Sequence, residues 1–234
     1  MRTFTCVLIA GFLGLNSSAD SGDTQSVDPR TGKADSKPTL VATMFGEPLD
    51  LGQLEPPDLE TKQKELPRGE FDEWLRQYRG RRTYESVWGA VLRRYVEREK
   101  LSVSAEELAA ITKSVERRLR SEPESPDGTT LTPAERKGIM VAWTRAILMD
   151  WKVCKSLYEK YGGRVGIGSL GAWIAFDAQN ALLREHYKAG DIQFHNGEIE
   201  AAFWKHTQVK NFADAYPQGE ELKRLLATPP YLQD

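Results

Sequence analysis

Histidine and cysteine side chains are the residues of this chain with the clearest capacity for metal binding or nucleophilic catalysis. The three histidines, His186, His195 and His206, all lie in the C-terminal part. None belongs to a close pair such as H-x-x-x-H, the spacing that places two imidazoles on one metal ion. We therefore expect surface or capping roles for them and no metal site. Cys154 lies on an apolar helix stripe, and no sequence signature supplies the base that a reactive thiol needs, so we expect a small buried side chain.

A glycine-rich stretch, residues 162–168 (GGRVGIG), has the composition of a phosphate-binding loop. It lacks the terminal Gly-Lys-Ser/Thr of such a loop, and it follows a helix rather than a strand. We interpret Gly162-Gly163 as a helix stop and residues 164–171 as a flexible connector. No Ser-His-Asp arrangement or nucleophile elbow is recognisable. The sequence thus assigns no catalytic residue and no cofactor, although scattered catalytic residues would leave no pattern, so enzyme activity stays an open question.

Charged residues are abundant but balanced, with 32 basic and 34 acidic side chains. This balance argues against nucleic acid as a partner. Arginines cluster locally at positions Arg76, Arg79, Arg81, Arg82, Arg93, Arg94 and Arg98. A solvated helix face is the simplest interpretation, and an acidic partner, anionic lipid head groups or a cell-wall polymer are the alternatives. Membrane contact is expected to be peripheral at most.

The first 19 residues have the pattern of a secretory signal peptide. Met1-Arg2 is a short basic region, Phe4 to Leu15 is apolar, and Ser17-Ser18-Ala19 supplies small residues before a cleavage site. Residues 20–38 carry almost no large apolar side chains and are expected to form a disordered spacer. The sequence therefore predicts an exported protein of the periplasm or cell exterior, soluble after cleavage near Ala19.

Residues 39–228 have the pattern of a single, mostly α, irregular multi-helix domain with one small N-terminal β-hairpin at 40–51. The hairpin pattern has a turn at 45–48, and Pro56-Pro57 and a charged connector follow it. Helical periodicity then begins near Gly69. Gly80 is expected to interrupt it, and residues 229–234 form an irregular tail. The helices are expected at about 69–79, 83–99, 105–120, 133–161, 172–188 and 198–206.

Capping boxes mark the starts of two of these helices, Ser104 to Glu107 and Thr132 to Glu135. The longer helix carries an apolar stripe of Ile139, Trp143, Ile147, Trp151, Cys154, Leu157 and Tyr161. Tryptophans on such stripes, including Trp88, are expected in the core. Trp173 and Trp204 lie near helix ends, so with Phe176 they are candidates for an exposed apolar groove. Adaptable apolar surface of this kind suits a protein that binds many polypeptide segments.

Two segments resemble the N-terminal, chaperone-like region of the SurA/PpiD group of exported parvulin-type peptidyl-prolyl isomerases. Residues 41–49 (VATMFGEPL) are similar to that group's opening strand, turn and G-E-P-I/L step. Residues 92–108 (LRRYVEREKLSVSAEEL) look like its helix leading into a capped next helix. The resemblance implies a small strand unit packed on a helical domain that binds unfolded or transiting polypeptides. It does not extend to a parvulin catalytic domain.

An exported chaperone-like polypeptide-binding protein without a catalytic centre is the function that these patterns favour. Met44 and Phe45 of the strand unit join Trp173, Phe176 and Trp204 as candidate binding residues. The partners would be unfolded or transiting polypeptides, or an envelope or secretion-pathway protein. A scaffolding partner of a cell-envelope complex is one alternative, and a divergent peptidyl-prolyl isomerase is another.

Overall fold

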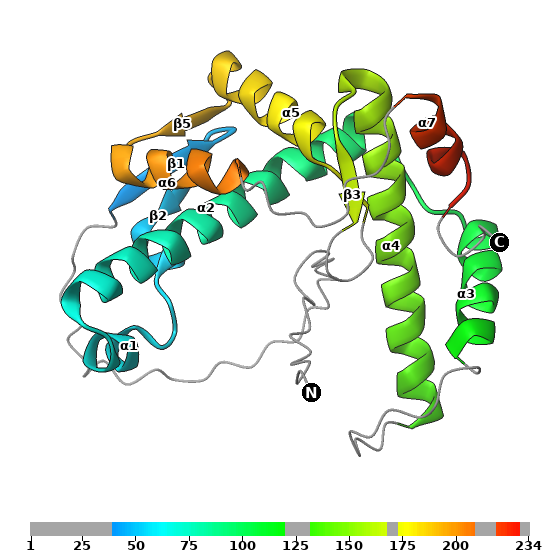
Figure 1. Ribbon diagram of the computed structural model, residues 1–234, viewed down its shortest axis with the longest axis horizontal. Coiled ribbons are helices and arrows are strands. Elements are labelled where there is room, and N and C mark those ends of the chain that lie inside the picture. Colours follow the sequence, from blue (N-terminus) through cyan, green and yellow to red (C-terminus); the bar gives the residue numbers. More distant parts are fainter. Residues whose placement is uncertain (1–38, 120–131, 168–172, 209–218, 230–234) are drawn as a thin grey trace, which may run out of the picture.

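A computed structural model describes residues 39–119, 132–167, 173–208 and 219–229. The expected leader 1–19, the expected spacer 20–38 and most of the expected tail lie outside this range. The described residues form seven α-helices and five short strands, so the fold is mostly α with a hairpin near the N-terminus, as the sequence predicted (Figure 1). No described helix is long and apolar enough to cross a membrane.

The hairpin pairs β1 (Leu40–Met44) with β2 (Glu47–Asp50) in antiparallel fashion. Its turn is shorter than the predicted 45–48, because only Phe45 and Gly46 lie between the strands. Both have positive φ, 53° and 85°, as a two-residue hairpin turn requires. Pro48 fits in β2 because β2 is an edge strand. A third strand, β5 (Ile192–Phe194), pairs with the other side of β1 and gives the order β2-β1-β5.

A short 3₁₀ turn (Leu51–Leu54) and α1 (Leu59–Glu65) follow, where the sequence suggested only a connector. The chain then forms α2 (Arg68–Arg98), a single helix of 31 residues. The predicted interruption at Gly80 was therefore wrong. A Cβ atom at Gly80 would lie 2.9 Å from Cβ of Ala202 in α6 (Gly197–Thr207). This glycine lets two helices approach closely and does not break α2.

Both predicted capping boxes are present. Glu107 N donates to Ser104 Oγ at 3.1 Å before α3 (Ala105–Leu119), and Ser104 N donates to Glu107 Oε2 at 2.8 Å. Thr132 and Glu135 make the same reciprocal pair at the start of α4 (Pro133–Tyr161). The stripe of α4 is buried from Ile147 to Leu157 and Tyr161 is partly buried, but Ile139 is 49% exposed, because that end of the helix extends beyond the core.

The segment after α4 is more extended than the sequence predicted. β3 (Val165–Ile167) pairs with β4 (Trp173–Ala175), in place of a purely flexible connector. Their β-branched and aromatic residues favour paired strands. The next helix, α5 (Phe176–Ala189), therefore begins four residues later than residue 172. The last described helix is α7 (Glu220–Ala227).

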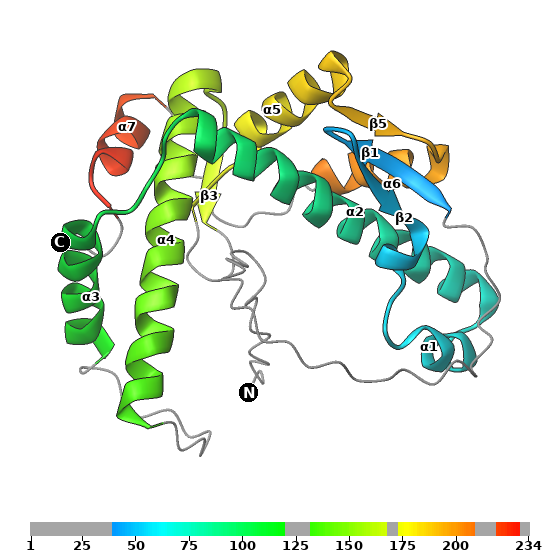
Figure 2. The same ribbon diagram turned by 180° about the vertical axis from the view of Figure 1, so that it is seen from behind.

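The long helices α2 and α4 meet near their C-terminal ends and diverge toward their N-terminal ends (Figures 1 and 2). Tyr95 Oη of α2 lies 2.7 Å from Ser156 Oγ of α4 at this junction. We call α1, α2, the three-stranded sheet and α6 the first arm, and α3, α4 and α7 the second arm. The main core runs through the junction, and a smaller core of Ile111, Val115 and Leu148 joins α3 to α4.

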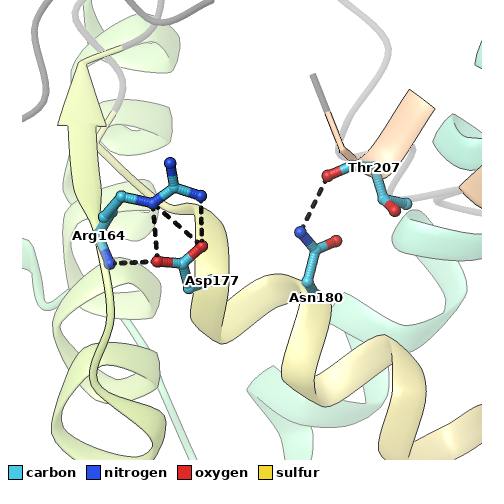
Figure 3. Close-up of polar contacts among 4 residues, drawn as sticks. All are labelled: Arg164, Asp177, Asn180 and Thr207. Carbon is cyan, nitrogen blue, oxygen red and sulfur yellow. Dashed lines mark hydrogen bonds and ion pairs between the residues drawn. The ribbon is translucent and has the colours of Figure 1, made fainter. Parts of the chain in front are cut away.

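Helix α5 connects the two arms through two polar contacts on its first turns (Figure 3). Asp177 accepts hydrogen bonds from the backbone N–H of Arg164 at 2.8 Å and from its guanidinium at 2.8 and 2.9 Å. Arg164 lies three residues after the end of α4, so we assign this contact to the second arm. Asn180 donates through Nδ2 to the carbonyl oxygen of Thr207, the last residue of α6, at 2.9 Å. The two contacts therefore fix each arm to the same helix.

Candidate functional site

An open groove of about 620 Å³ lies between α3 and α4 on the second arm. Apolar side chains form most of its surface: Val103, Ala105, Leu108, Ala109 and Val141. The two alanines are exposed, and their small side chains allow another chain to approach the α3 backbone. The groove is thus apolar, accessible and shallow, which suits an extended or helical polypeptide better than a small molecule.

Polar side chains along the same groove are Thr112, Lys113, Glu116 and Arg145. They bring charges of both signs, so the groove has no strong preference for one sign of ligand charge. Within the described part of the chain, Thr112 Oγ1 is buried without a hydrogen-bond partner.

Lys152 of α4 holds the start of α3 beside the groove. Its Nζ donates to Glu107 Oε2 at 2.7 Å and to the carbonyl oxygen of Ser102 at 2.6 Å. The hydrogen bond from Lys152, and then the one from the Ser104 backbone, hold the pKa of Glu107 below its ordinary value. Glu107 therefore serves both the helix cap and the contact between the two helices that form the groove.

Glu107→Gln is expected to lower the free energy of unfolding by about 0.5–1 kcal/mol at neutral pH. The amide oxygen still caps α3, but the charge opposite Lys152 is lost. A carboxylate with a lowered native pKa stabilises the fold above its unfolded pKa, and this stability disappears as pH falls through the native value. The difference should thus vanish in acid. Urea unfolding at both pH values tests this, with Glu106→Gln, an exposed first-turn acid, as the control for helix-dipole effects.

A second partly exposed apolar surface lies on the N-terminal half of α2, on the first arm. Its aromatic rings contact one another in series, Phe71 to Trp74 at 5.8 Å and Trp74 to Tyr78 at 5.9 Å between centroids. Among the described residues, neither core cluster includes these three side chains. We call Phe71, Trp74 and Tyr78 the aromatic stripe.

The arginines near the stripe are engaged with acidic neighbours. Arg82 and Arg81 of α2 lie 2.6 and 3.8 Å from carboxylate oxygens of Glu85. Arg76 pairs with Glu73, and Arg79 with Glu55. Arg76, Arg81 and Arg82 are exposed, whereas Arg79 is partly buried against Glu55, so this part of the cluster is not uniformly solvated.

The described residues contain no arrangement suited to metal or thiol chemistry. Within the described ranges, no group of three or more His, Cys, Asp or Glu side chains could hold a metal ion. Burial, with the Asp150 charge as a smaller cause, raises the pKa of Cys154 to about 12. Its thiol is thus protonated at neutral pH and is a poor nucleophile. Burial also raises the pKa of Asp150 to about 6.

Two of the five binding residues predicted from the sequence are core residues. Trp173 lies in β4 and is 5% exposed, and Met44 in β1 is 9% exposed and paired with Ile192. The expectation that Trp173 lines an open groove was based on a helix starting at 172. Because residues 173–175 form a strand, the indole instead enters the main core. Phe176, the first residue of α5, is partly buried.

Phe45 and Trp204 are partly exposed, but both pack against α5. Phe45 lies between the Arg94 guanidinium, 4.0 Å from its ring centroid, and the His186 ring at 5.2 Å. Trp204 contacts Tyr187 edge-on at 5.4 Å, and the Arg184 guanidinium lies 4.8 Å from its ring centroid. None of the five residues lines the α3–α4 groove.

The groove residues that sequence reasoning missed lie beside the expected stripes. Ala105 and Ala109 are small and lie off the α3 core positions, and Val141 lies off the α4 stripe. Val141 and the exposed Ile139 give the first half of α4 more apolar residues than one core face needs. These additional apolar residues were the sequence signal that could have indicated a second apolar surface on α4.

Comparison with protein-family models, curated proteins and solved structures gave no match. The groove and the stripe are therefore interpreted from their own geometry.

Proposed function

We propose that this protein is an exported, chaperone-like polypeptide-binding protein that holds unfolded or transiting chains without chemically altering them. The observation that carries the proposal is the pair of accessible apolar surfaces on two diverging arms. One is the α3–α4 groove and the other is the aromatic stripe of α2. The signal-peptide pattern of residues 1–19 supports export to the periplasm or cell exterior.

The shape of each surface supports binding to many sequences. Aromatic side chains give large contact area at low entropy cost, and open apolar grooves accept varied side chains. An unfolded chain exposes apolar segments at intervals, so two surfaces on separate arms could bind two segments of one client. Linking two weak contacts in this way raises the overall affinity without any tight individual site.

Ala109→Arg is expected to weaken binding of an unfolded client by about tenfold, or about 1.4 kcal/mol. The substitution places a long charged side chain in the groove. Arginine and alanine both favour helices, so α3 should remain folded. The matched control is Ala110→Arg, on an exposed neighbouring position that does not line the groove. Binding is measured by titration with a labelled, chemically unfolded client, and holding by suppression of its aggregation.

The first arm has its own matched pair, Trp74→Ala and Gln77→Ala. We expect the former to weaken client binding and the latter to leave it unchanged. Equal affinity in all four variants and the wild type would contradict a client-binding role for these surfaces. A wild type that binds one folded envelope protein but no unfolded client would instead support the scaffolding function.

A further inference from the structure

The short helix α7 is held on the second arm by one apolar face. Leu222 and Leu226 are 0% and 2% exposed, and they belong to the same core cluster as Cys154 and Leu157 of α4. Leu225 is partly buried against that cluster. The opposite face is charged and solvated, with Lys223 donating to Glu220 at 2.7 Å. Three leucines at spacings of three and four residues therefore dock this helix.

A cavity that opens to solvent lies beside the contact between α7 and α4. It has a volume of about 550 Å³ and is lined by Tyr158 and Gly162 on the α4 side and by Leu226 and Ala227 of α7. Helices as short as eight residues are marginal in water without packing, so α7 depends on this contact for its structure. Packing alone therefore holds α7 in place, so a segment with the same apolar pattern can compete for its site.

The site of α7 lies on the same flank of α4 as α3. Both views show α3 beside the N-terminal half of α4 and α7 beside its C-terminal end (Figures 1 and 2). This flank of α4 therefore accepts helices along its length. The charges beside the cavity are Lys155 and Glu159 of α4 and Lys223 of α7, so both signs are present.

We propose that the α4 surface around Tyr158 is a docking site for amphipathic helical segments of client polypeptides, and that α7 is its internal occupant, which such a segment displaces. The occupant's chemistry is taken from α7 itself: leucines at positions i, i+3 and i+4, with charged residues between them. This inference rests on the proposed function only in naming a client polypeptide as the displacing segment.

The test uses the full chain with Leu222→Asp and Leu226→Asp, which prevents α7 from docking. The probe is a fluorescent peptide that copies residues 219–229. We expect it to bind the double variant at least tenfold more tightly than the wild type, because tethered α7 no longer competes. The matched control is Glu221→Ala with Arg224→Ala, because both are exposed residues of α7 that do not line the cavity. It should bind the probe as the wild type does.

A locked chain keeps the test decisive if the double variant does not fold. Lys155→Cys and Lys223→Cys place thiols on opposite sides of the cavity, and a short bis-maleimide joins them, while the native Cys154 is buried. The locked chain should lose the weak binding that the wild type shows. Equal probe binding by the locked chain and the wild type, or by the double variant and the wild type, overturns the proposal. The expected probe results without any protection of an unfolded client would retain the docking site and refute the chaperone-like function.

Discussion

Trp173→Ala is expected to lower the free energy of unfolding by about 3–5 kcal/mol, among the largest effects of any single truncation here. The indole is 5% exposed and lies in the main core between β4 and α4, so its removal leaves a cavity in packed surroundings. Chemical denaturation with intrinsic fluorescence and circular dichroism measures the change. Client binding should weaken only in proportion to the unfolded fraction.

Trp204→Ala is the comparison for this experiment. Its ring is partly exposed, with Phe203 at 4.8 Å on one side and the Arg184 guanidinium at 4.8 Å. We expect a smaller loss of about 1–2 kcal/mol, within the ordinary range for point mutations. If Trp173→Ala weakened client binding and left stability intact, the assignment of Trp173 to the core would be wrong.

Gly80→Ala should destabilise the protein by about 1–3 kcal/mol, although alanine is the better helix former. The added Cβ would lie 2.9 Å from Cβ of Ala202 and 3.1 Å from its backbone carbonyl carbon and oxygen. Helix α6 would have to move away from α2, which would disturb the packing of the whole first arm. Thermal and urea unfolding measure the effect.

Gly89→Ala on the same helix is the control for intrinsic propensity. A Cβ atom there meets no atom within 4 Å, so the substitution should stabilise α2 by about 0.5–1 kcal/mol. A lower free energy of unfolding in Gly80→Ala together with a higher one in Gly89→Ala would confirm that Gly80 is needed for close packing. Stabilisation at both would show that α6 can yield without cost.

Local signals in the sequence predicted most of the fold. The hairpin, both capping boxes and the full length of α4 follow from residues within a few positions of one another, such as Thr132 and Glu135. The errors occurred where a distant partner decides the structure. Local sequence predicts a helix break at Gly80, but the close packing of α6 on this residue shows why glycine is needed there. Local sequence likewise predicts a helix at Trp173, but pairing between β3 and β4 makes it a strand.

The candidate site was less predictable than the fold for the same reason. Periodicity shows which residues share a helix face, but it does not show which faces meet. The aromatic stripe of α2 is visible in the sequence, yet its partial exposure depends on how far α6 extends along the helix. The groove is formed by two helices, so Ala109 and Val141 can be recognised as groove residues only when the packing of α3 against α4 is known.

The pairing of β1 with β5 sets the order in which this chain can complete its fold during synthesis. Thr43 Oγ1 lies 2.8 Å from His195 Nε2, across 152 positions of sequence. Ribosomes add roughly 5–20 residues per second, so β1, the central strand, waits on the order of 8–30 s for its second partner, β5, to be made. An isolated two-stranded hairpin is at best marginally stable in water. The first arm therefore closes late, after α2, α3 and α4 have been synthesised, and until then its apolar strand faces and the Gly80 face of α2 remain accessible to other chains.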